Sequence, residues 1–299
     1  MSSKRLPRSL AAALLGLQAA CSAQPTHGPE CRLQNPALDE LSGLVASGNG
    51  DYYWGLNDSG GQPWLFRVGP CGEDLGHVEI QGVRNHDWED IAFFDDHGTP
   101  SILIADTGDN LARRKRVQLY AVAEPGPETR STAIAWQQDF TYPEGPRDAE
   151  SLAVDPRSGD ILVLSKREDP QHLFRVPRGE GTVVAEDLGP VSTIQTKLTL
   201  NWLRGMVYQL YGSLPTALDI SRDGRRIAVL TLTELFVWTR QGDEDWAELM
   251  NREPHHYVIP ASLEQAESMA ITAEGDTIVI SSENAGSPMI RIGVVDEAP

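Results

Sequence analysis

Carboxylate side chains recur in this sequence at the ends of short apolar runs. Glu89, Glu150 and Glu267 stand at the head of three such runs. Other acidic or amide side chains follow apolar runs, at Asp58, Asp106, Asp109 and Asn110. Calcium takes six to eight oxygen ligands of these kinds, and converging carboxylates need a cation, a basic partner or raised pKa values to offset their repulsion. These seven residues are therefore candidate calcium ligands.

The same three glutamates are candidate catalytic groups, together with His86 and Lys166. His86 opens the polar stretch His-Asp-Trp-Glu-Asp, where it could serve as a general base. Lys166 follows an apolar run and could hold an anionic substrate. Structural alternatives stay open: glutamates bonded to backbone amides of a neighbouring element, a surface His86, and an ion pair between Lys166 and Glu150.

A fivefold repeat predicts the elements that hold these residues. Each unit opens with a small or acidic residue and an apolar run, crosses a glycine-containing turn, and returns as a second apolar run. Short runs rich in Ile, Val, Leu and Tyr around Gly and Asp turns are typical of β-hairpins. The openings are at 42–45, 89–92, 150–153, 216–219 and 267–270, and the turns are at 47–50, 95–98, 155–159, 221–224 and 272–275.

Further strands complete each unit. A third apolar run follows every hairpin, and weaker fourth strands are expected at 76–81, 133–141, 193–200 and 256–259. Three or four strands in roughly forty to fifty residues is the period of a propeller blade. We therefore predict an all-β fold, a β-propeller of five blades over residues 38–299. A sixth, degenerate blade between 179 and 214 is the alternative to an insertion near 201–213.

The propeller geometry brings the chemical groups together. The first two strands of a blade are antiparallel, so the head of the first and the end of the second lie at the same end of the central channel. Aligning the repeats predicts a ring of first-strand residues at one mouth: Ser42, Glu89, Glu150, Thr216 and Glu267. The end of each second strand should bring its polar residues to the same mouth.

The ring also has to close, and the fifth unit shows no fourth strand. The N-terminal segment 21–37 precedes the repeats, and its residues 31–37 could supply that strand. Cys31 and Cys71 form an even pair once Cys21 is set aside, which predicts a disulfide that holds this segment down. Two unpaired buried thiols are the alternative.

Residues 1–20 have the pattern of a secretory signal peptide. Three basic residues precede an apolar stretch at 10–20. The stretch 17–21 resembles a bacterial lipoprotein box, which would leave Cys21 lipid-modified, although Gln18 stands where an aliphatic residue is usual. Ordinary cleavage after Ser22 or Ala23 is the alternative. We expect a periplasmic or cell-envelope protein, lipid-anchored through Cys21 or otherwise secreted.

The net negative charge of the chain limits the classes of partner that it can bind. The 299 residues carry 43 acidic and 25 basic side chains, and removal of residues 1–20 would change the formal charge from −18 to −21. Nucleic acids and anionic membrane surfaces need a positive partner, so neither is expected apart from a lipid anchor. An acidic surface is compatible with cation binding and also with solubility alone. We expect a monomer.

The repeat openings carry a resemblance to known proteins. Ser-Gly-Leu at 42–44, Glu-Ser-Leu-Ala at 150–153 and the Asp-Gly turn at 223–224 resemble bacterial secreted propellers grouped as NHL-like, SdiA-regulated and esterase-like-phytase proteins. The resemblance runs from about residue 38 to the C-terminus. It implies the propeller architecture more specifically than an activity, because propellers host binding modules, hydrolases and scaffolds alike.

Three hypotheses about function follow. The first is an exported propeller that binds a small molecule or an envelope protein at the acidic mouth. The second is a calcium-dependent hydrolase of the lactonase or esterase type at the same mouth. The third is a purely structural envelope scaffold. No phosphate-binding loop, dinucleotide fingerprint or zinc motif is found, so no cofactor other than calcium is expected.

Overall fold

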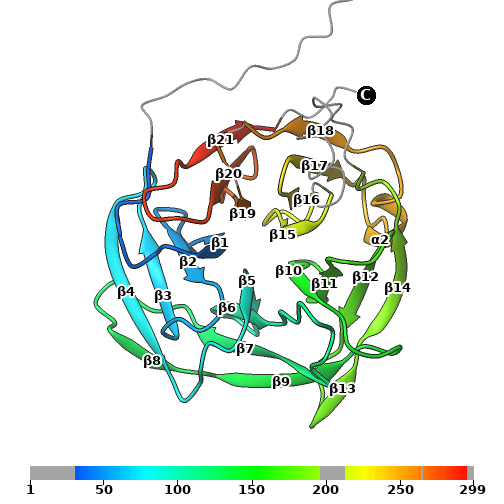
Figure 1. Ribbon diagram of the computed structural model, residues 1–299, viewed down its shortest axis with the longest axis horizontal. Helices are drawn as coiled ribbons and strands as arrows, with labels where there is room; N and C mark the ends of the chain where they lie inside the picture. The colour runs from blue at the N-terminus through cyan, green and yellow to red at the C-terminus, as the bar shows by residue number, and fades with distance from the viewer. Residues whose placement is uncertain (1–30, 196–212, 261, 264, 295–299) are drawn as a thin grey trace, which may run out of the picture.

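The computed structural model describes residues 31–195, 213–260, 262–263 and 265–294, and its strands form five sheets arranged in a ring about a central axis (Figure 1). The all-β, five-bladed propeller predicted from the repeats is confirmed. The expected signal peptide, Cys21, and all but the last residue of the expected insertion at 201–213 lie outside the described residues.

The strands of each blade run outward from the channel in chain order. Blade 1 holds β1 (Leu41–Ala46), β2 (Tyr53–Asn57), β3 (Trp64–Val68) and β4 (Asp74–Gln81). Blade 2 holds β5 (Trp88–Asp96), β6 (Thr99–Asp106), β7 (Val117–Ala123) and β9 (Trp136–Thr141). Blade 3 holds β10 (Ala149–Val154), β11 (Ile161–Ser165), β12 (Gln171–Val176) and β14 (Glu186–Val191). Blade 4 holds β15 (Pro215–Ile220), β16 (Arg226–Thr231), β17 (Glu234–Thr239) and β18 (His255–Val258), and blade 5 holds β19 (Ala266–Ile271), β20 (Thr277–Ser282) and β21 (Ile290–Gly293).

Apolar side chains fill the space between neighbouring blades. The innermost strands β1, β10 and β15 are buried over their whole length. The turns that follow β1 and β15 contain Gly50 and Gly224, whose φ angles are 78° and 64°. The buried hydrophobic residues form five clusters, and each cluster joins two adjacent blades. Removing this apolar surface from water is the main term that holds the blades together.

Outer-edge elements overlap adjacent blades. Strand β8 (Ser131–Ala133) lies between β7 and β9 of blade 2 in the sequence, but it pairs in parallel with β4 of blade 1. Strand β13 (Thr182–Val184) lies between β12 and β14 of blade 3, but it pairs in parallel with β9 of blade 2. Helix α2 (Trp246–Leu249) of blade 4 lies against β14 of blade 3 in the same way. The sequence repeats did not predict these contacts, because they join a loop to a different blade.

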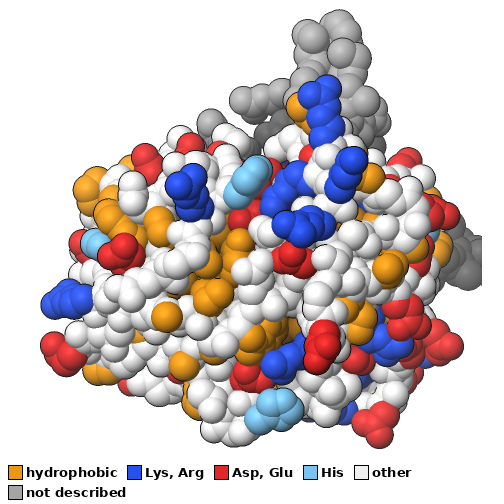
Figure 2. Space-filling model, turned by 90° about the horizontal axis from the view of Figure 1, so that it is seen from below, with side chains coloured by type: hydrophobic (Ala, Val, Ile, Leu, Met, Phe, Trp, Pro, Cys, Tyr) orange, Lys and Arg blue, Asp and Glu red, His pale blue; other side chains and the backbone are white. Residues whose placement is uncertain are grey.

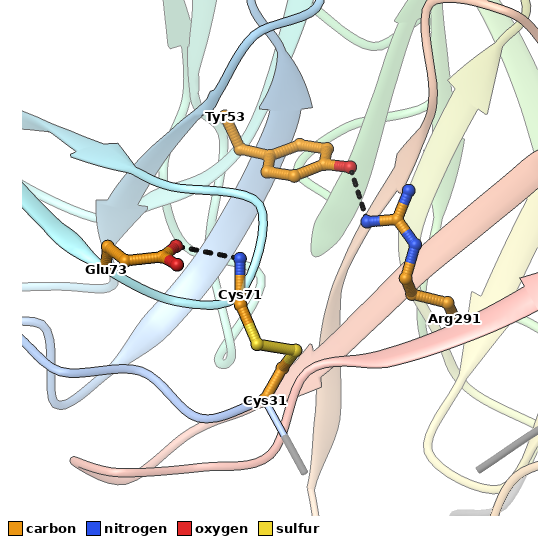
Figure 3. Close-up of a disulfide and its surroundings, with 5 residues drawn as sticks. All are labelled: Cys31, Tyr53, Cys71, Glu73 and Arg291. Carbon is orange, nitrogen blue, oxygen red and sulfur yellow. Dashed lines mark hydrogen bonds between the residues drawn. A yellow bond between two sulfur atoms is a disulfide. The ribbon is translucent and has the colours of Figure 1, made fainter. Parts of the chain in front are cut away.

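The ring closes where blade 5 meets blade 1. Arg32 forms an isolated antiparallel bridge with Pro288, where the sequence predicted a strand at 31–37. The predicted disulfide between Cys31 and Cys71 is present and ties this segment to the turn between β3 and β4 (Figure 3). Beside it, Arg291 of blade 5 donates a hydrogen bond to the Tyr53 hydroxyl of blade 1 at 3.2 Å.

The fourth strand of blade 3 corrects one sequence prediction. It was expected at 193–200, but the structure has it at β14, over Glu186–Val191. This strand contains Gly189 and Pro190 and is largely solvent-facing, so it lacks the apolar alternation on which the prediction relied. An outer edge strand tolerates proline, because one side of it has no partner to which a backbone N–H must donate.

Charged side chains are scattered over one side of the propeller. Acidic and basic side chains are interspersed with hydrophobic ones on the side shown in Figure 2, and Lys and Arg side chains gather near its upper edge. Within the described part of the chain, no helix is both long and apolar enough to cross a bilayer.

Candidate functional site

A register shift recurs at the same place in all five blades. Each innermost strand skips one residue in its pairing with the second strand, directly after its first paired residue. Such a bulge re-aims the extra side chain. The five skipped residues are the ring residues of the sequence analysis: Ser42, Glu89, Glu150, Thr216 and Glu267.

Backbone hydrogen bonds place the ring at one end of the channel with the ends of the second strands. The N–H of Asp58 donates to the carbonyl of Glu40 at 2.9 Å, and the N–H of Lys166 donates to that of Asp148 at 2.9 Å. Gly108 donates to Asp87 in the same way at 3.2 Å. We call the side chains gathered here the acidic mouth: Asp58, Asp87, Glu89, Asp148, Glu150, Lys166, Glu267 and Glu283.

The two hydroxyl ring residues have a structural role. The Ser42 hydroxyl donates to the Glu89 carbonyl at 2.5 Å, and the Thr216 hydroxyl donates to the Ala266 carbonyl at 2.8 Å. Each bond joins one blade to another, so these side chains fasten the ring rather than offer ligands.

Glu89 lies where the acidic side chains converge. Its side chain is buried, with 3 % of the residue exposed, and no described residue donates a hydrogen bond to its carboxylate. It belongs to two groups whose carboxylate oxygens lie within 4.8 Å of one another: Asp58, Asp87 and Glu89, and Glu89, Asp148 and Glu150. A carboxylate to which no described residue donates has its oxygens available to a cation bound between the two groups.

The two carboxylate groups differ in how many hydrogen bonds their oxygen atoms already accept from the protein. Asp148 accepts from the Asp109 N–H at 2.9 Å and from Arg167 Nε at 2.5 Å. Among the described residues, the Asp58 carboxylate accepts only from the N–H of Ser59, and none donates to the Asp87 carboxylate. The Asp58, Asp87 and Glu89 group therefore has more free oxygen atoms for an added cation.

Lys166 acts as an internal cation on the other side of the mouth. Its ammonium group forms an ion pair with the Glu150 carboxylate, and both residues are buried. Burial opposes the ammonium charge, but Glu150 and Glu267 more than compensate and raise the pKa of Lys166. The structure thus shows the ion pair between Lys166 and Glu150 that the sequence left as an alternative.

Burial and mutual repulsion raise the pKa values of the mouth carboxyls. Burial and the nearby Glu150 raise the pKa of Glu89 well above its ordinary range. Burial and Asp58 raise the pKa of Asp87 to about 6. Burial raises the pKa of Glu150 to about 7 and that of Glu267 to about 9, against the opposing effect of Lys166. At neutral pH Glu267 therefore holds its proton, whereas Asp87 is mostly ionised and available to a cation.

The loop after β6 supplies anchors rather than free ligands. Asp106 pairs with Arg114 at 2.6 Å, both Asp109 oxygens accept backbone N–H groups of the loop, and Asn110 accepts from Arg167. These three candidate ligands lie outside the two carboxylate groups, as does Glu267. His86 is exposed and has no hydrogen bond or ion pair among the described residues.

Gly108 allows this loop to approach the mouth. A Cβ atom at Gly108 would lie 2.0 Å from Oε1 of Glu89 and 2.6 Å from the Asp87 carboxylate. A side chain there would displace both carboxylates, so the glycine is required by their position.

Sequence reasoning missed Asp87 and Asp148 as site residues. A signal was present: each stands two positions before a ring glutamate, in Asp-Trp-Glu and Asp-Ala-Glu. An extended chain places residues two apart on the same side, so both pairs point toward the mouth.

Two other buried carboxylates fasten the channel wall. Asp90 accepts the N–H groups of Leu152 and Leu218 at 2.8 and 3.2 Å, and Asp219 accepts that of Ile271 at 2.7 Å. Burial raises the pKa of Asp219 to about 7. The structural role expected of the ring glutamates therefore falls to residues farther along the inner strands.

Comparisons with known proteins add little to this geometry. No protein-family model matches the chain, and no curated protein is similar in sequence. Among solved structures, the crystal structure of the Myceliophteria thermophila Cps50 (Swd1) β-propeller domain is similar with a TM-score of 0.41 and 10 % identity, over 85 % of this chain and 67 % of that one. The likeness carries no argument about function, which has to come from the site.

Proposed function

We propose that this chain is an exported β-propeller that binds a ligand at its acidic mouth, and that the ligand includes a divalent cation, calcium. The observation that carries the proposal is Glu89, a buried carboxylate without a donor at the meeting point of two carboxylate groups. Lys166 already compensates Glu150 and Glu267. The cation would therefore lie among Asp58, Asp87 and Glu89.

Calcium fits this donor set better than zinc. The ligands are carboxylate oxygens without a histidine or cysteine, and hard cations such as calcium favour oxygen. Three carboxylates leave room for water or for an oxygen of a second ligand. A small molecule or an envelope protein could then bind through the cation at the channel mouth.

Thermal unfolding of the mature protein tests the proposal. An ion that binds only the native state raises the melting temperature, and at one hundred times its Kd it adds about 2.7 kcal/mol. We expect a reversible rise on moving from EDTA to millimolar calcium, absent in Glu89→Gln and retained in Glu79→Gln, an exposed carboxylate on β4. No rise in the unaltered protein would contradict the proposal.

A hydrolase of the lactonase or esterase type is the second candidate function. Glu150 favours it, because burial raises its pKa to about 7, close to the value that suits a general acid or base at neutral pH. Glu150→Gln should abolish turnover in a screen of lactones and esters while leaving the far-ultraviolet circular dichroism unchanged. Absence of turnover in the unaltered protein with calcium would leave binding as the function.

Export to the periplasm or cell envelope is part of the proposal. The disulfide between Cys31 and Cys71 supports an oxidising compartment. Lipid attachment at Cys21 is tested by labelling cells with a fatty-acid analogue, which should mark the unaltered chain but not Cys21→Ser. The resemblance to NHL-like, SdiA-regulated and esterase-like-phytase propellers stays a prediction.

A further inference from the structure

Glu89 belongs to both carboxylate groups of the acidic mouth, so the mouth offers two neighbouring cation positions that share one ligand. Within each group the carboxylate oxygens lie within 4.8 Å of one another. Calcium binds oxygen at about 2.3–2.6 Å, so one ion can reach oxygens that are roughly 5 Å apart. Two metal ions about 3.5–4 Å apart are the arrangement of phosphatases and nucleases. The occupancy of the two positions therefore decides which chemistry is open to the mouth.

The second position, among Glu89, Asp148 and Glu150, already holds a positive group. The Lys166 ammonium forms an ion pair with the Glu150 carboxylate, and the lysine residue is only 7 % exposed. Arg167 Nε donates to the Asp148 carboxylate at 2.5 Å. Two of the three carboxylates at this position are thus paired with cationic side chains of the protein.

The first position, among Asp58, Asp87 and Glu89, has no such group. No lysine or arginine in the described part of the chain forms an ion pair with these three carboxylates. The two positions therefore differ in charge, although both are built from three carboxylates. A divalent cation at the second position would be repelled by the Lys166 ammonium, whereas the first position is open to it.

The place of Lys166 in the repeat shows that its positive charge is particular to blade 3. In blades 1, 3 and 5 the residue directly after the second strand donates its backbone N–H to the residue two positions before the ring residue. These bonds run from Asp58 to Glu40 at 2.9 Å, from Lys166 to Asp148 at 2.9 Å, and from Glu283 to Gln265 at 3.2 Å. The side chain at this position is a carboxylate in blades 1 and 5 and an ammonium in blade 3. Blade 3 thus supplies a cation where the other two blades supply acidic groups.

We propose that Lys166 fills the second cation position, so that the native mouth takes one divalent cation, held by Asp58, Asp87 and Glu89. This inference rests on the proposed cation site and adds its stoichiometry and the residue that sets it. One cation with open coordination positions suits a ligand that offers it an oxygen atom, such as a carboxylate, carbonyl or hydroxyl group. It does not suit phosphoester cleavage by two metal ions, which needs the second position.

Calorimetric titration with calcium of the mature protein and of Lys166→Met tests the inference. The unaltered protein should bind one calcium ion per chain. Lys166→Met keeps a side chain of similar length and removes the charge, so it should bind two. Lys115→Met removes an exposed lysine of the loop between β6 and β7, and it should bind one ion like the unaltered protein.

Electron paramagnetic resonance with manganese tests whether the two ions are neighbours. Manganese also takes carboxylate ligands, and two manganese ions bridged by Glu89 would couple magnetically and broaden the spectrum of an isolated ion. We expect the isolated-ion spectrum in the unaltered protein and the coupled spectrum in Lys166→Met. Adding Glu150→Gln to Lys166→Met removes a ligand of the second position and should restore one ion with the isolated-ion spectrum.

The outcomes separate this inference from the proposed function. Two ions or a coupled spectrum in the unaltered protein would overturn the inference, and this measurement does not depend on the folding of any variant. One ion in a Lys166→Met protein with native far-ultraviolet circular dichroism would overturn it as well. Both results would leave the proposed function standing, whereas no bound ion in the unaltered protein would contradict the cation site itself and the inference with it.

Discussion

Carboxylates from four blades gather at the acidic mouth with one lysine among them, whereas the opposite end of the channel is held by arginines. There, Arg222 donates to the Gly48 carbonyl at 2.6 Å, Arg226 to Gly275 at 2.6 Å, and Arg157 to Asp223 at 3.0 Å. Each of these acceptors belongs to a turn of another blade. These three guanidinium groups thus donate hydrogen bonds to backbone carbonyls of the protein itself.

The difference assigns separate tasks to the two ends. Guanidinium groups with several fixed donors suit backbone carbonyls, so we assign a stabilising role to the arginines at this end. At the mouth, no described residue donates to the carboxylates of Glu89 and Asp87, and their pKa values are raised, which is the pattern expected of a functional site. Changes at the two ends should therefore have different consequences.

The largest effect is expected at the opposite end, for Asp155→Ala. Asp155 accepts from Arg240 at 3.0 and 3.1 Å and from the Trp246 indole N–H at 2.8 Å, and it is 3 % exposed. Its removal leaves a buried guanidinium uncompensated, which costs about 3–5 kcal/mol. Urea unfolding should show this loss of stability, while the calcium affinity of the variant stays unchanged. A changed calcium affinity would contradict the assignment of separate roles to the two ends.

Loss of the disulfide should destabilise the ring closure by a comparable or smaller amount. The bond closes a loop with a sequence separation of 40 residues, and removing a native disulfide from a secreted domain costs about 2–5 kcal/mol. A Cys31→Ser and Cys71→Ser double variant should unfold at a lower urea concentration and bind calcium normally. Equal urea midpoints for the two proteins would show that the disulfide does not stabilise the ring.

The repeats predicted the mouth because local patterns encode it. A bulge residue at the same strand position in five blades leaves the same mark in the sequence, and Ser42, Glu89, Glu150, Thr216 and Glu267 could be aligned without a structure. The antiparallel hairpin then fixes which end they share.

Contacts between blades could not be predicted in this way. Nothing near Asp90 in the sequence reveals that its acceptors are used by the N–H groups of Leu152 and Leu218, and nothing near Ser131 reveals its pairing with Glu79 of blade 1. The acceptors of Arg222 are equally remote. Such hydrogen-bond partners depend on how the five blades pack in the ring. The sequence therefore predicted the strands of each blade better than the contacts between blades.

Lys166→Met sharpens the account of the mouth itself. Without its ammonium group, Glu150 and Glu267 lose their internal cation, and we expect a loss of about 1–3 kcal/mol in EDTA at neutral pH, since the carboxyls can take up protons instead. Calcium should restore most of the loss and bind more tightly than in the unaltered protein. Weaker calcium binding in this variant would mean that Lys166 supports the cation site instead of competing with it.

The free energy of unfolding should also depend on pH. The native pKa values of Asp87, Asp219 and Glu267 are raised to about 6, 7 and 9. A raised carboxyl pKa stabilises the native state fully below its ordinary value and loses that contribution as the pH rises through the native value. In EDTA the free energy of unfolding should therefore decline between about pH 4 and pH 9. Calcium should reverse the share of this decline that comes from the mouth carboxyls, but not the share that comes from Asp219. A free energy of unfolding that does not change with pH in EDTA would contradict the prediction.

Terbium luminescence tests the central claim most directly. Terbium replaces calcium at oxygen sites and emits when a neighbouring tryptophan is excited, and the buried Trp88 directly precedes Glu89. We predict sensitised emission from the mature protein that calcium displaces, that Glu89→Gln abolishes and that Glu79→Gln retains. Equal emission from Glu89→Gln and the unaltered protein, or no emission from either, would contradict a cation site at the acidic mouth.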